Sequence, residues 1–491
     1  MADARMDVLI PLLLYFLVIY GLGFYSMRFV SRASRRGGTG FLNEYLIGDR
    51  NMGGFVLAMT LVATYLSAGS FIGGPGTAYT MGLSWVFLAM SQMPTGYFTL
   101  AVLGKKFAII ARKINAVTVT DFLRERYENR LLGVVVSMSV VFFFMAAMSA
   151  QFIGAARLIQ GAVGIPYETA LAFFGLTVLI YTIIGGFRAV ILTDTLQGIV
   201  MTIGTTVVLV AVIVSGGGVA NLVQNLYEID SGLISPYGPD PSFTTMAWVA
   251  SFWILVGFAI VGLPQVATRA MSYKDSGSLK NGIIYGTVVS MVLLIGMHLL
   301  GAFGRVMVPD IASGDLVVST VTTTLFPNWI AGIILAGPLA AVMSTVDSQL
   351  LLAVGAIVND VYANLINTRV ENTAKITFIS SIVIGAIIFV ASFDPPDLMV
   401  WLNLYANAGL ISTFLWPVIL GLYWKRANTA GAFASIITGI GTYITFNILL
   451  PRPLGFHTIV LPLILSLVAF VLFTYLTPKP SQRIVQKFWG V

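Results

Sequence analysis

The sequence is poor in charge. Asp, Glu, Lys and Arg make up only 10% of its 491 residues, whereas ordinary soluble domains carry about 25%. Hydrophobic residues make up 57%, and the mean hydropathy is +0.91. Water does not solvate a folded globule of this composition, so we predict a polytopic membrane protein. This excludes soluble enzymes, disordered scaffolds and nucleic-acid readers, although the net charge of +7 would suit a polyanionic partner.

Cysteine is absent, and only two histidines occur, His298 and His457. The lack of cysteine excludes disulfides, thiolate metal sites and iron–sulfur clusters. With so few imidazoles available as ligands, we expect neither a structural metal site nor a bound cofactor.

Thirteen apolar windows are long enough to cross a bilayer, which takes about 20 residues each. They lie at residues 7–27, 52–80, 84–104, 131–158, 167–186, 189–214, 243–263, 281–303, 328–358, 375–392, 397–422, 429–449 and 457–477. No soluble domain separates them, so we predict a single all-α transmembrane domain over residues 1–491 with about 13 helices. The alternative is that one weak window is a re-entrant or interfacial segment.

Positive charge is distributed unevenly among the loops. If the amino terminus is outside, all but four of the 27 Lys and Arg residues fall in inner segments, at 28–50, 105–130, 188, 269–280, 369–375, 425–426 and 479–487. The exceptions are Arg5, Arg157, Arg305 and Arg452. The outer loop 215–242 has no basic residue. Because cytoplasmic loops hold the positive charge, we predict an outer amino terminus and a cytoplasmic carboxyl terminus.

The second window has small and polar residues in its middle, including Ser67, Gly69, Ser70 and Gly73. An unpaired backbone group at bilayer depth costs several kcal/mol, so a broken helix persists only where it lines a cavity or holds a ligand. The free carbonyls of a break suit a cation, and the amino end of the next half-helix suits an anion. The alternative is close packing through the small pair Gly69 and Gly73.

The ninth window contains five oxygen-bearing side chains within residues 344–349. The hydroxyls of Ser344 and Thr345, with the carbonyl of Ala341 one turn earlier, can converge on a hard cation such as sodium. The alternative is that these hydroxyls bond only to their own backbone. Asp347 is harder to explain as structural, because a carboxylate within a span is costly and usually functional.

Two further spans carry polar signals. Asp194 in span six follows an expected tight turn at 185–188, and it either pairs with Arg188 or lies on an ion path. Span seven is interrupted at 261–265 by Gly262 and Pro264, where proline removes a donor and disturbs the helix. That proline either ends the span or marks a second break.

The two interruptions open two sets of five spans that run in opposite orientations. Paired interruptions of this kind indicate an inverted-repeat transporter. We predict a first repeat at about 52–214 and a second at about 243–422. The span at 7–27 precedes them, and two extra spans at 429–477 follow.

Several stretches resemble the sodium:solute symporter family, and the resemblance covers nearly the whole chain. They are FLNEY at 41–45, SFIGGPG at 70–76, GKKFA at 104–108, QFIG at 151–154, GIPYET at 164–169, YTIIGGFR at 181–188, YKDS at 273–276, VMST at 342–345, WLNL at 401–404 and LWP at 415–417. The resemblance implies a leucine-transporter-like fold with a five-plus-five inverted repeat.

The resemblance also implies a sodium site. It maps onto backbone oxygens of span two and onto span nine, at Ala63, Leu66, Ala341, Ser344 and Thr345. A family aspartate linked to sodium handling maps onto Asp194. Tyr65 stands where some members have an acid, and Asp347 where many have a neutral residue, so a second cation or a proton at Asp347 is a further hypothesis.

The substrate implied by the resemblance is pantothenate, a small anion with hydroxyl and amide groups. Its site should offer a few donors in an apolar cavity. By position, the candidates are Tyr65, Ser67, Ser70, Gln92, Gln151, Arg157, Trp253, Gln265 and Asn403. Arg157 would neutralise the carboxylate, or else extend to the outer interface.

We therefore expect a sodium-coupled symporter that imports pantothenate by alternating access across a bacterial inner membrane, with one chain sufficient. Another solute (proline, a sugar or a monocarboxylate), proton coupling through Asp194 or Asp347, and a channel remain alternatives. We do not expect an enzyme or a primary pump, since the sequence has no nucleophile elbow, paired metal-binding histidines or phosphate-binding glycine loop.

Overall fold

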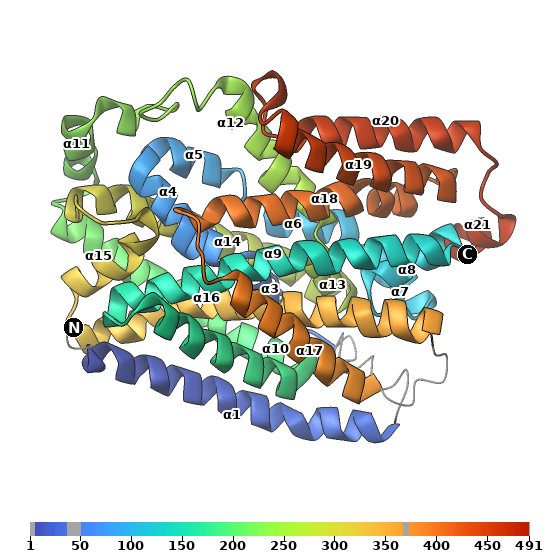
Figure 1. Ribbon diagram of the computed structural model, residues 1–491, viewed down its shortest axis with the longest axis horizontal. Helices are drawn as coiled ribbons and strands as arrows, with labels where there is room; N and C mark the ends of the chain where they lie inside the picture. Colours follow the sequence, from blue (N-terminus) through green and yellow to red (C-terminus); the bar gives the residue numbers. More distant parts are fainter. Residues whose placement is uncertain (1–4, 37–50, 367–372, 491) are drawn as a thin grey trace.

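The protein is described by a computed structural model that covers all residues except 1–4, 37–50, 367–372 and 491. The motif at 41–45 and the basic residues Arg50 and Arg369 lie outside the described residues. Within those residues the chain is helical, and the one β pairing is an isolated bridge between Met52 and Tyr273. Figure 1 shows most helices running along the long axis of the molecule. The expected all-α class is confirmed.

The first half of the chain forms the helices that precede the loop at 216–245. They are α1 (Met6–Arg36), α3 (Gly54–Tyr65), η2 (Gly69–Gly73), α4 (Gly74–Met81), α5 (Leu83–Met90), α6 (Thr95–Thr99), η3 (Leu100–Gly104), α7 (Lys105–Lys113), α8 (Val119–Tyr127), α9 (Arg130–Val163) and α10 (Tyr167–Ser215).

The second half begins on this loop and ends with a short helix. Its elements are α11 (Val219–Ile229), η4 (Ser231–Ile234), α12 (Met246–Phe252), η5 (Trp253–Phe258), η6 (Ala259–Gly262), α13 (Pro264–Met271), α14 (Ser276–Met307), η7 (Gly314–Leu316), α15 (Val317–Leu325), α16 (Asn328–Gly355), η8 (Ala356–Ile366), α17 (Thr373–Ala391), α18 (Met399–Tyr423), α19 (Thr429–Leu449), η9 (Pro453–Gly455), α20 (Val460–Leu476) and α21 (Gln482–Trp489).

All thirteen predicted windows fall on apolar helices. Eight described helices are long and apolar enough to cross a membrane, two bent helix pairs pass the same test together, and three shorter apolar helices occupy the remaining windows. The windows at 167–186 and 189–214 both lie in α10, which has 49 residues. The prediction of a tight turn at 185–188 is therefore wrong, because the backbone there is helical. The apolar segments of α10 on either side, Tyr167–Ile183 and Ala189–Ser215, correspond to the two windows.

The two predicted interruptions are real bends. The axis turns by 69° between α3 and the η2–α4 segment, and by 48° between the α12–η6 segment and α13. At each bend a leucine leaves the helical conformation in the same way, Leu66 at φ −80°, ψ 117° and Leu263 at φ −77°, ψ 122°. Two spans far apart in the sequence therefore break with one local geometry, as an internal repeat predicts.

Glycine permits the second half of the first broken span to pack against its neighbours. A Cβ on Gly301 of α14 would lie 2.2 Å from the carbonyl oxygen of Pro75, and one on Gly314 would lie 2.5 Å from that of Gly76. Such distances are not tolerated between non-bonded atoms, so only glycine allows these backbones to meet. The contacts fix α4 between α14 and η7.

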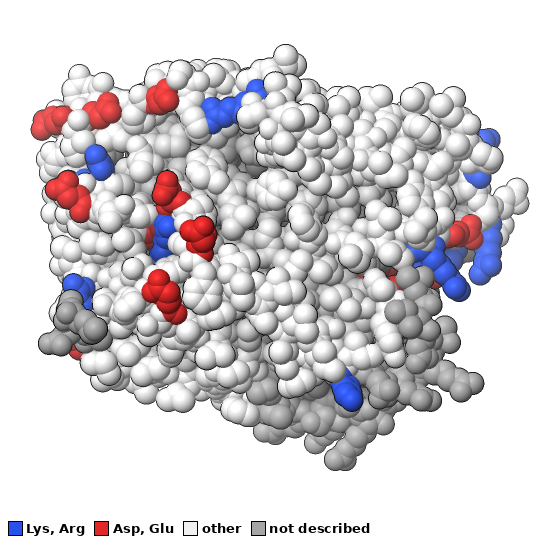
Figure 2. All heavy atoms as spheres, in the orientation of Figure 1, with Lys and Arg blue, Asp and Glu red and all other residues white. Residues whose placement is uncertain are grey.

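Acidic side chains are unevenly placed along the long axis. In Figure 2, most acidic side chains visible in this view lie toward the end formed by α11 and α15, where some basic side chains also lie, and basic side chains predominate at the opposite end, where α8 and α21 lie. The breaks lie between these ends, within the apolar belt.

Candidate sodium and substrate site

The break after α3 leaves backbone oxygens available. The last carbonyls of a helix have no partner four residues on, and the extended residue Leu66 ends the ladder here. The Ser344 hydroxyl of α16 donates to the carbonyl of Ala63 at 2.7 Å. Its oxygen also lies 3.0 Å from the carbonyl of Ala341, as does that of Thr345. Span two and span nine thus bring four of the five predicted sodium ligands together, at Ala63, Ala341, Ser344 and Thr345.

This grouping suits a hard monovalent cation. All of the predicted ligand atoms are neutral oxygens, two from hydroxyls and three from carbonyls, and Ala63, Leu66, Ala341 and Ser344 are fully buried. The hydroxyls already bond to carbonyls that would share the ion, so binding requires them only to turn their protons away. The sodium site remains a prediction, with a geometry that fits it.

A buried charge cluster lies one turn further along α16. The Asp347 carboxylate accepts hydrogen bonds from the hydroxyls of Tyr181 and Thr182. The neighbouring Ser348 accepts from Arg269 at 2.6 Å, and the same guanidinium nitrogen lies 3.2 Å from Asp194. Both predicted ion-path acids therefore belong to one cluster, next to the predicted sodium ligands.

Arg269 has a different place from the one expected. We assigned it to an inner loop, but it lies on α13 just after the second break and is 1% exposed. Its guanidinium lies over the ring of Phe187, 5.1 Å from the ring centre. The partner described for Asp194 is thus Arg269; the side chain of Arg188, the partner considered from sequence, is not described. Arg269 lies 75 residues from Asp194 in the sequence, so no local pattern could have predicted that the two residues pair.

Hydroxyls connect this cluster to the sodium ligands. Ser348 donates to the carbonyl of Ser344 at 2.9 Å and lies 3.3 Å from the hydroxyl of Thr64. Thr64 precedes the break and Ser344 is a predicted ligand. Two hydrogen bonds, from Arg269 to Ser348 and from Ser348 to the carbonyl of Ser344, therefore join the Arg269–Asp194 pair to a residue that carries a predicted sodium ligand.

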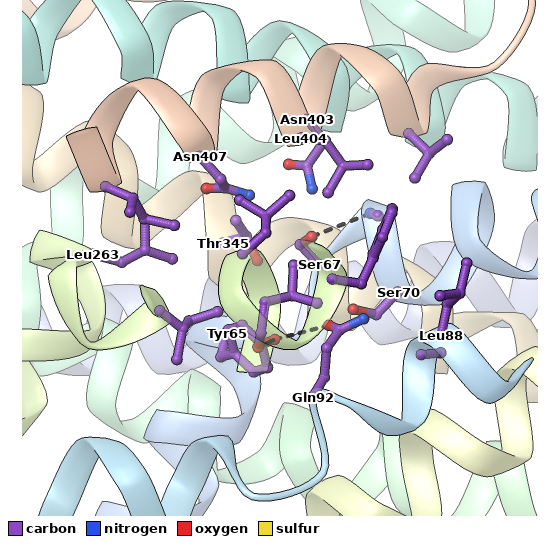
Figure 3. Close-up of a pocket in the computed structure, with 18 of the residues that line it drawn as sticks. Tyr65, Ser67, Ser70, Leu88, Gln92, Leu263, Thr345, Asn403, Leu404 and Asn407 are labelled. Carbon is purple, nitrogen blue, oxygen red and sulfur yellow. Dashed lines mark hydrogen bonds between the residues drawn. The ribbon is translucent and has the colours of Figure 1, made fainter. Parts of the chain in front are cut away.

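A cavity opens beside the two breaks. Six of the nine predicted substrate residues line it, namely Tyr65, Ser67, Ser70, Gln92, Gln265 and Asn403. Figure 3 shows most of them projecting toward a common space, with the Tyr65 hydroxyl donating to Gln92 at 2.8 Å. Thr345 lines the same cavity, so the predicted sodium and substrate positions adjoin. The open volume is about 50 Å³, which makes movement of the lining necessary for a molecule of pantothenate's size.

The other three candidates lie outside the cavity wall. Gln151 is fully buried, where it accepts from the amide of Ala68 at 2.8 Å and donates to Asn403 at 3.1 Å. It therefore holds the break in shape. Trp253 lies on η5 and is 48% exposed. Arg157 instead bonds to Asp315 and to the carbonyls of Pro396 and Asp397.

Five polar lining residues were missed from sequence. They are Thr64, Trp85, His298, Gln349 and Asn407. Gln349 follows Thr345 by four residues, and Asn407 follows Asn403 by four, so reading one face of each helix would have found both. His298 comes from a span in which no other site residue was predicted, and only the folded arrangement brings it and Trp85 to the cavity.

Arg157 ties three segments together. Its guanidinium bonds to the Asp315 carboxylate of η7 at 2.8 Å and to the carbonyls of Pro396 and Asp397, just before α18, at 2.7 and 2.6 Å. Asp315 also accepts from the amide of Met399 at 3.2 Å. These bonds fasten the last turns of α9 to η7 and to the start of α18.

Asp315 gives this fastening a pH dependence. Burial raises the pKa of Asp315 from 3.8 to about 6, although Arg157 opposes the shift. The carboxyl of Asp315 then binds its proton more tightly in the folded protein than in the unfolded chain. This difference adds about 3 kcal/mol at most to the free energy of unfolding below pH 4, and the contribution is lost as the pH rises through 6.

We therefore expect wild type to gain thermal stability relative to Asp315→Asn when the pH falls from 7 to 4.5. Unfolding midpoints of both proteins across a pH series in one detergent measure the difference. A difference that does not change with pH, or one that grows in favour of the variant on acidification, would contradict this assignment.

Known proteins resemble the chain over almost all of its length. The sequence profile described as sodium:solute symporter family matches residues 45–439. The sodium/pantothenate symporter of Escherichia coli (strain K12) is 48% identical over 95% of this chain and 96% of that protein. The sodium/pantothenate symporter of Haemophilus influenzae (strain ATCC 51907 / DSM 11121 / KW20 / Rd) is 44% identical over the same shares.

Solved structures share the fold. A Na+-coupled sialic acid symporter in a substrate-bound outward-open state matches with a TM-score of 0.77 at 19% identity, over 97% of this chain and 99% of that one. Mhp1, a nucleobase-cation-symport-1 family transporter, matches with a TM-score of 0.56 at 14% identity, over 91% and 98%. The expected leucine-transporter-like fold is confirmed. With a family profile over most of the sequence and relatives that are transporters rather than enzymes, the chain belongs to the sodium:solute symporter family.

Proposed function

We propose that this protein imports pantothenate together with sodium by alternating access. The observation that carries the proposal is the junction of a broken helix with α16, where the Ser344 hydroxyl meets the Ala63 carbonyl beside a polar cavity. Relatives named as sodium/pantothenate symporters support the choice of ion and solute.

Coupling follows from the position of Thr345. It is a predicted sodium ligand and also lines the cavity. An ion between α3 and α16 orders the wall against which the substrate binds, so each favours the other, and the two effects on affinity are equal. Each net positive charge that moves inward gains about 2.3 kcal/mol per 100 mV of membrane potential.

We further propose that the amino terminus is outside and the carboxyl terminus is cytoplasmic in a bacterial inner membrane. An odd number of spans places the termini on opposite sides, and in Figure 1 α1 begins at the end opposite α21. The acidic end near α11 is then external, and the basic end near α21 faces the cytoplasm.

The absence of cysteine makes this orientation easy to test. A cysteine introduced at exposed Asp240 is expected to react with a membrane-impermeant maleimide on intact cells, whereas one at exposed Arg483 is expected to react only after the membrane is opened. Cysteine-free wild type is the control. The reverse labelling pattern would overturn the proposed orientation.

Other solutes are the first alternative. In proteoliposomes with an inward sodium gradient, excess unlabelled pantothenate is expected to suppress uptake of the labelled form by more than 90%, while proline, glucose and lactate at equal concentration leave it unchanged. The expectation rests on the hydroxyl and amide groups lining the cavity. Suppression by proline as strong as that by pantothenate would move the proposal to another substrate.

Proton coupling is the second alternative, since Asp194 and Asp347 are both fully buried in one cluster. Uptake driven by a pH gradient in sodium-free buffer would favour it. We favour sodium because the oxygen cluster at Ser344 contains no acid, and a site for a proton alone needs no convergent carbonyls.

A further inference from the structure

The cavity has no charged side chain of either sign among the described residues that line it. Its polar lining consists of hydroxyls, amides, the indole of Trp85 and the imidazole of His298. The Nδ1 atom of His298 lies 2.7 Å from the carbonyl of Leu294. His298 is buried on α14, and a buried imidazole without an acidic partner favours its neutral form. The proposed substrate is an anion, so the cavity itself does not supply its counter-charge.

The nearby arginines are already paired. Arg269 is bonded to Asp194 and Ser348, and Arg157 is bonded to Asp315 and to two carbonyls. Neither lines the cavity. A carboxylate removed from water without a positive partner is strongly disfavoured, so bound pantothenate needs another cation.

The predicted sodium position adjoins the cavity at one end. Thr345 belongs to both, and Gln349 lies one turn further on the same helix and also lines the cavity. In Figure 3, Thr345 and Asn407 lie toward one side of the cavity, and Ser70 and Leu88 toward the other. We propose that the carboxylate of the substrate lies at the Thr345 end and is neutralised by the coupling sodium ion, so that the two bind as an ion pair. This inference rests on the proposed function.

Unpaired polar atoms in the cavity can bind the remaining polar groups of pantothenate, which are its hydroxyls and its amide. Among the described residues, buried Trp85 Nε1, Gln265 Oε1, Gln349 Oε1 and Asn407 Oδ1 have no hydrogen-bond partner. The amide of Gln349 can turn its NH₂ group toward the carboxylate beside Thr345. The amide oxygens of Gln265 and Asn407 can accept from the two hydroxyls or the amide N–H of pantothenate, and Trp85 can donate to its carbonyl. Burial without partners is costly, so binding satisfies both sides.

The ion pair is tested with pantothenyl alcohol, in which CH₂OH replaces the carboxylate. Binding of each compound to purified protein is measured by calorimetry at 1 and 100 mM sodium. Pantothenate is expected to bind at least tenfold more tightly at high sodium, and the alcohol to change less than twofold. Equal sodium dependence of the two compounds would overturn the inference.

A second experiment places a fixed positive charge beside the proposed carboxylate position. The variant Gln349→Lys is expected to bind pantothenate at 1 mM sodium at least tenfold more tightly than wild type does, whereas Gln224→Lys on exposed α11 is expected to behave as wild type. If the alcohol does not bind and Gln349→Lys keeps the full sodium requirement, the inference is wrong. Failure of the proposed function looks different, because sodium would then have no effect on pantothenate binding or uptake in wild type.

Discussion

Replacing Ser344 and Thr345 together by alanine is expected to raise the sodium concentration for half-maximal uptake about 100-fold. Each substitution removes one neutral oxygen ligand, and a ligand worth about 1.4 kcal/mol changes affinity tenfold. The three carbonyl ligands remain, so sodium binding is weakened rather than abolished. The measurement is initial uptake of labelled substrate into proteoliposomes over a sodium series, for each single variant and for the double variant.

The matched control is Ser412→Ala. Ser412 is likewise buried on a core helix, but its hydroxyl bonds to the carbonyl of Ala408 on its own helix. It should leave sodium dependence unchanged. If the double variant kept the sodium dependence of wild type, the ion would have to bind elsewhere, and the junction of α3 with α16 would lose its assigned role.

Removing one charge of the Arg269–Asp194 pair is expected to destabilise the protein by about 3–5 kcal/mol, because it leaves the other charge buried without a partner. Arg269→Met and Asp194→Leu should each lower the thermal unfolding midpoint in detergent. The double variant should lose less than the sum of the two single changes, since no isolated charge remains. We expect both single variants to lose most sodium-driven uptake as well, because the pair joins the sodium ligands through Ser348.

Lys425→Met is the control for removing a positive charge from an exposed position. It should change the unfolding midpoint little, since isolated surface charges contribute little to stability. If the losses of stability caused by the Arg269 and Asp194 substitutions were strictly additive, the two groups would not interact. The ion pair would then contribute nothing to the stability of the protein.

The spans and the breaks were predictable because the bilayer imposes them on the sequence. Hydropathy located thirteen windows that all fall on apolar helices, and the glycine and proline runs near Gly69 and Pro264 located the bends. The polar face of span nine was equally visible, since Ser344, Thr345 and Asp347 stand out in an apolar helix. These are local signals, and a local signal needs no knowledge of neighbours.

The side-chain partnerships were not predictable in this way. Arg269 reads as a loop residue by charge and position, yet its contacts with Asp194 and Ser348 place it in the core. The charge of Arg157 suggested a substrate ligand, yet its guanidinium forms an ion pair with Asp315. The glycines at 185–186 suggested a turn, but the backbone of α10 stays helical there. The errors at Arg269 and Arg157 concern residues whose roles depend on segments distant in sequence.

The most direct test of the account is uptake of labelled pantothenate by the purified protein in proteoliposomes, with and without an inward sodium gradient. The account predicts accumulation above the external concentration with the gradient, collapse of that accumulation when sodium is equal on both sides or replaced by potassium, and none in protein-free vesicles. Accumulation that is independent of sodium, or no uptake of pantothenate under any gradient, would contradict it.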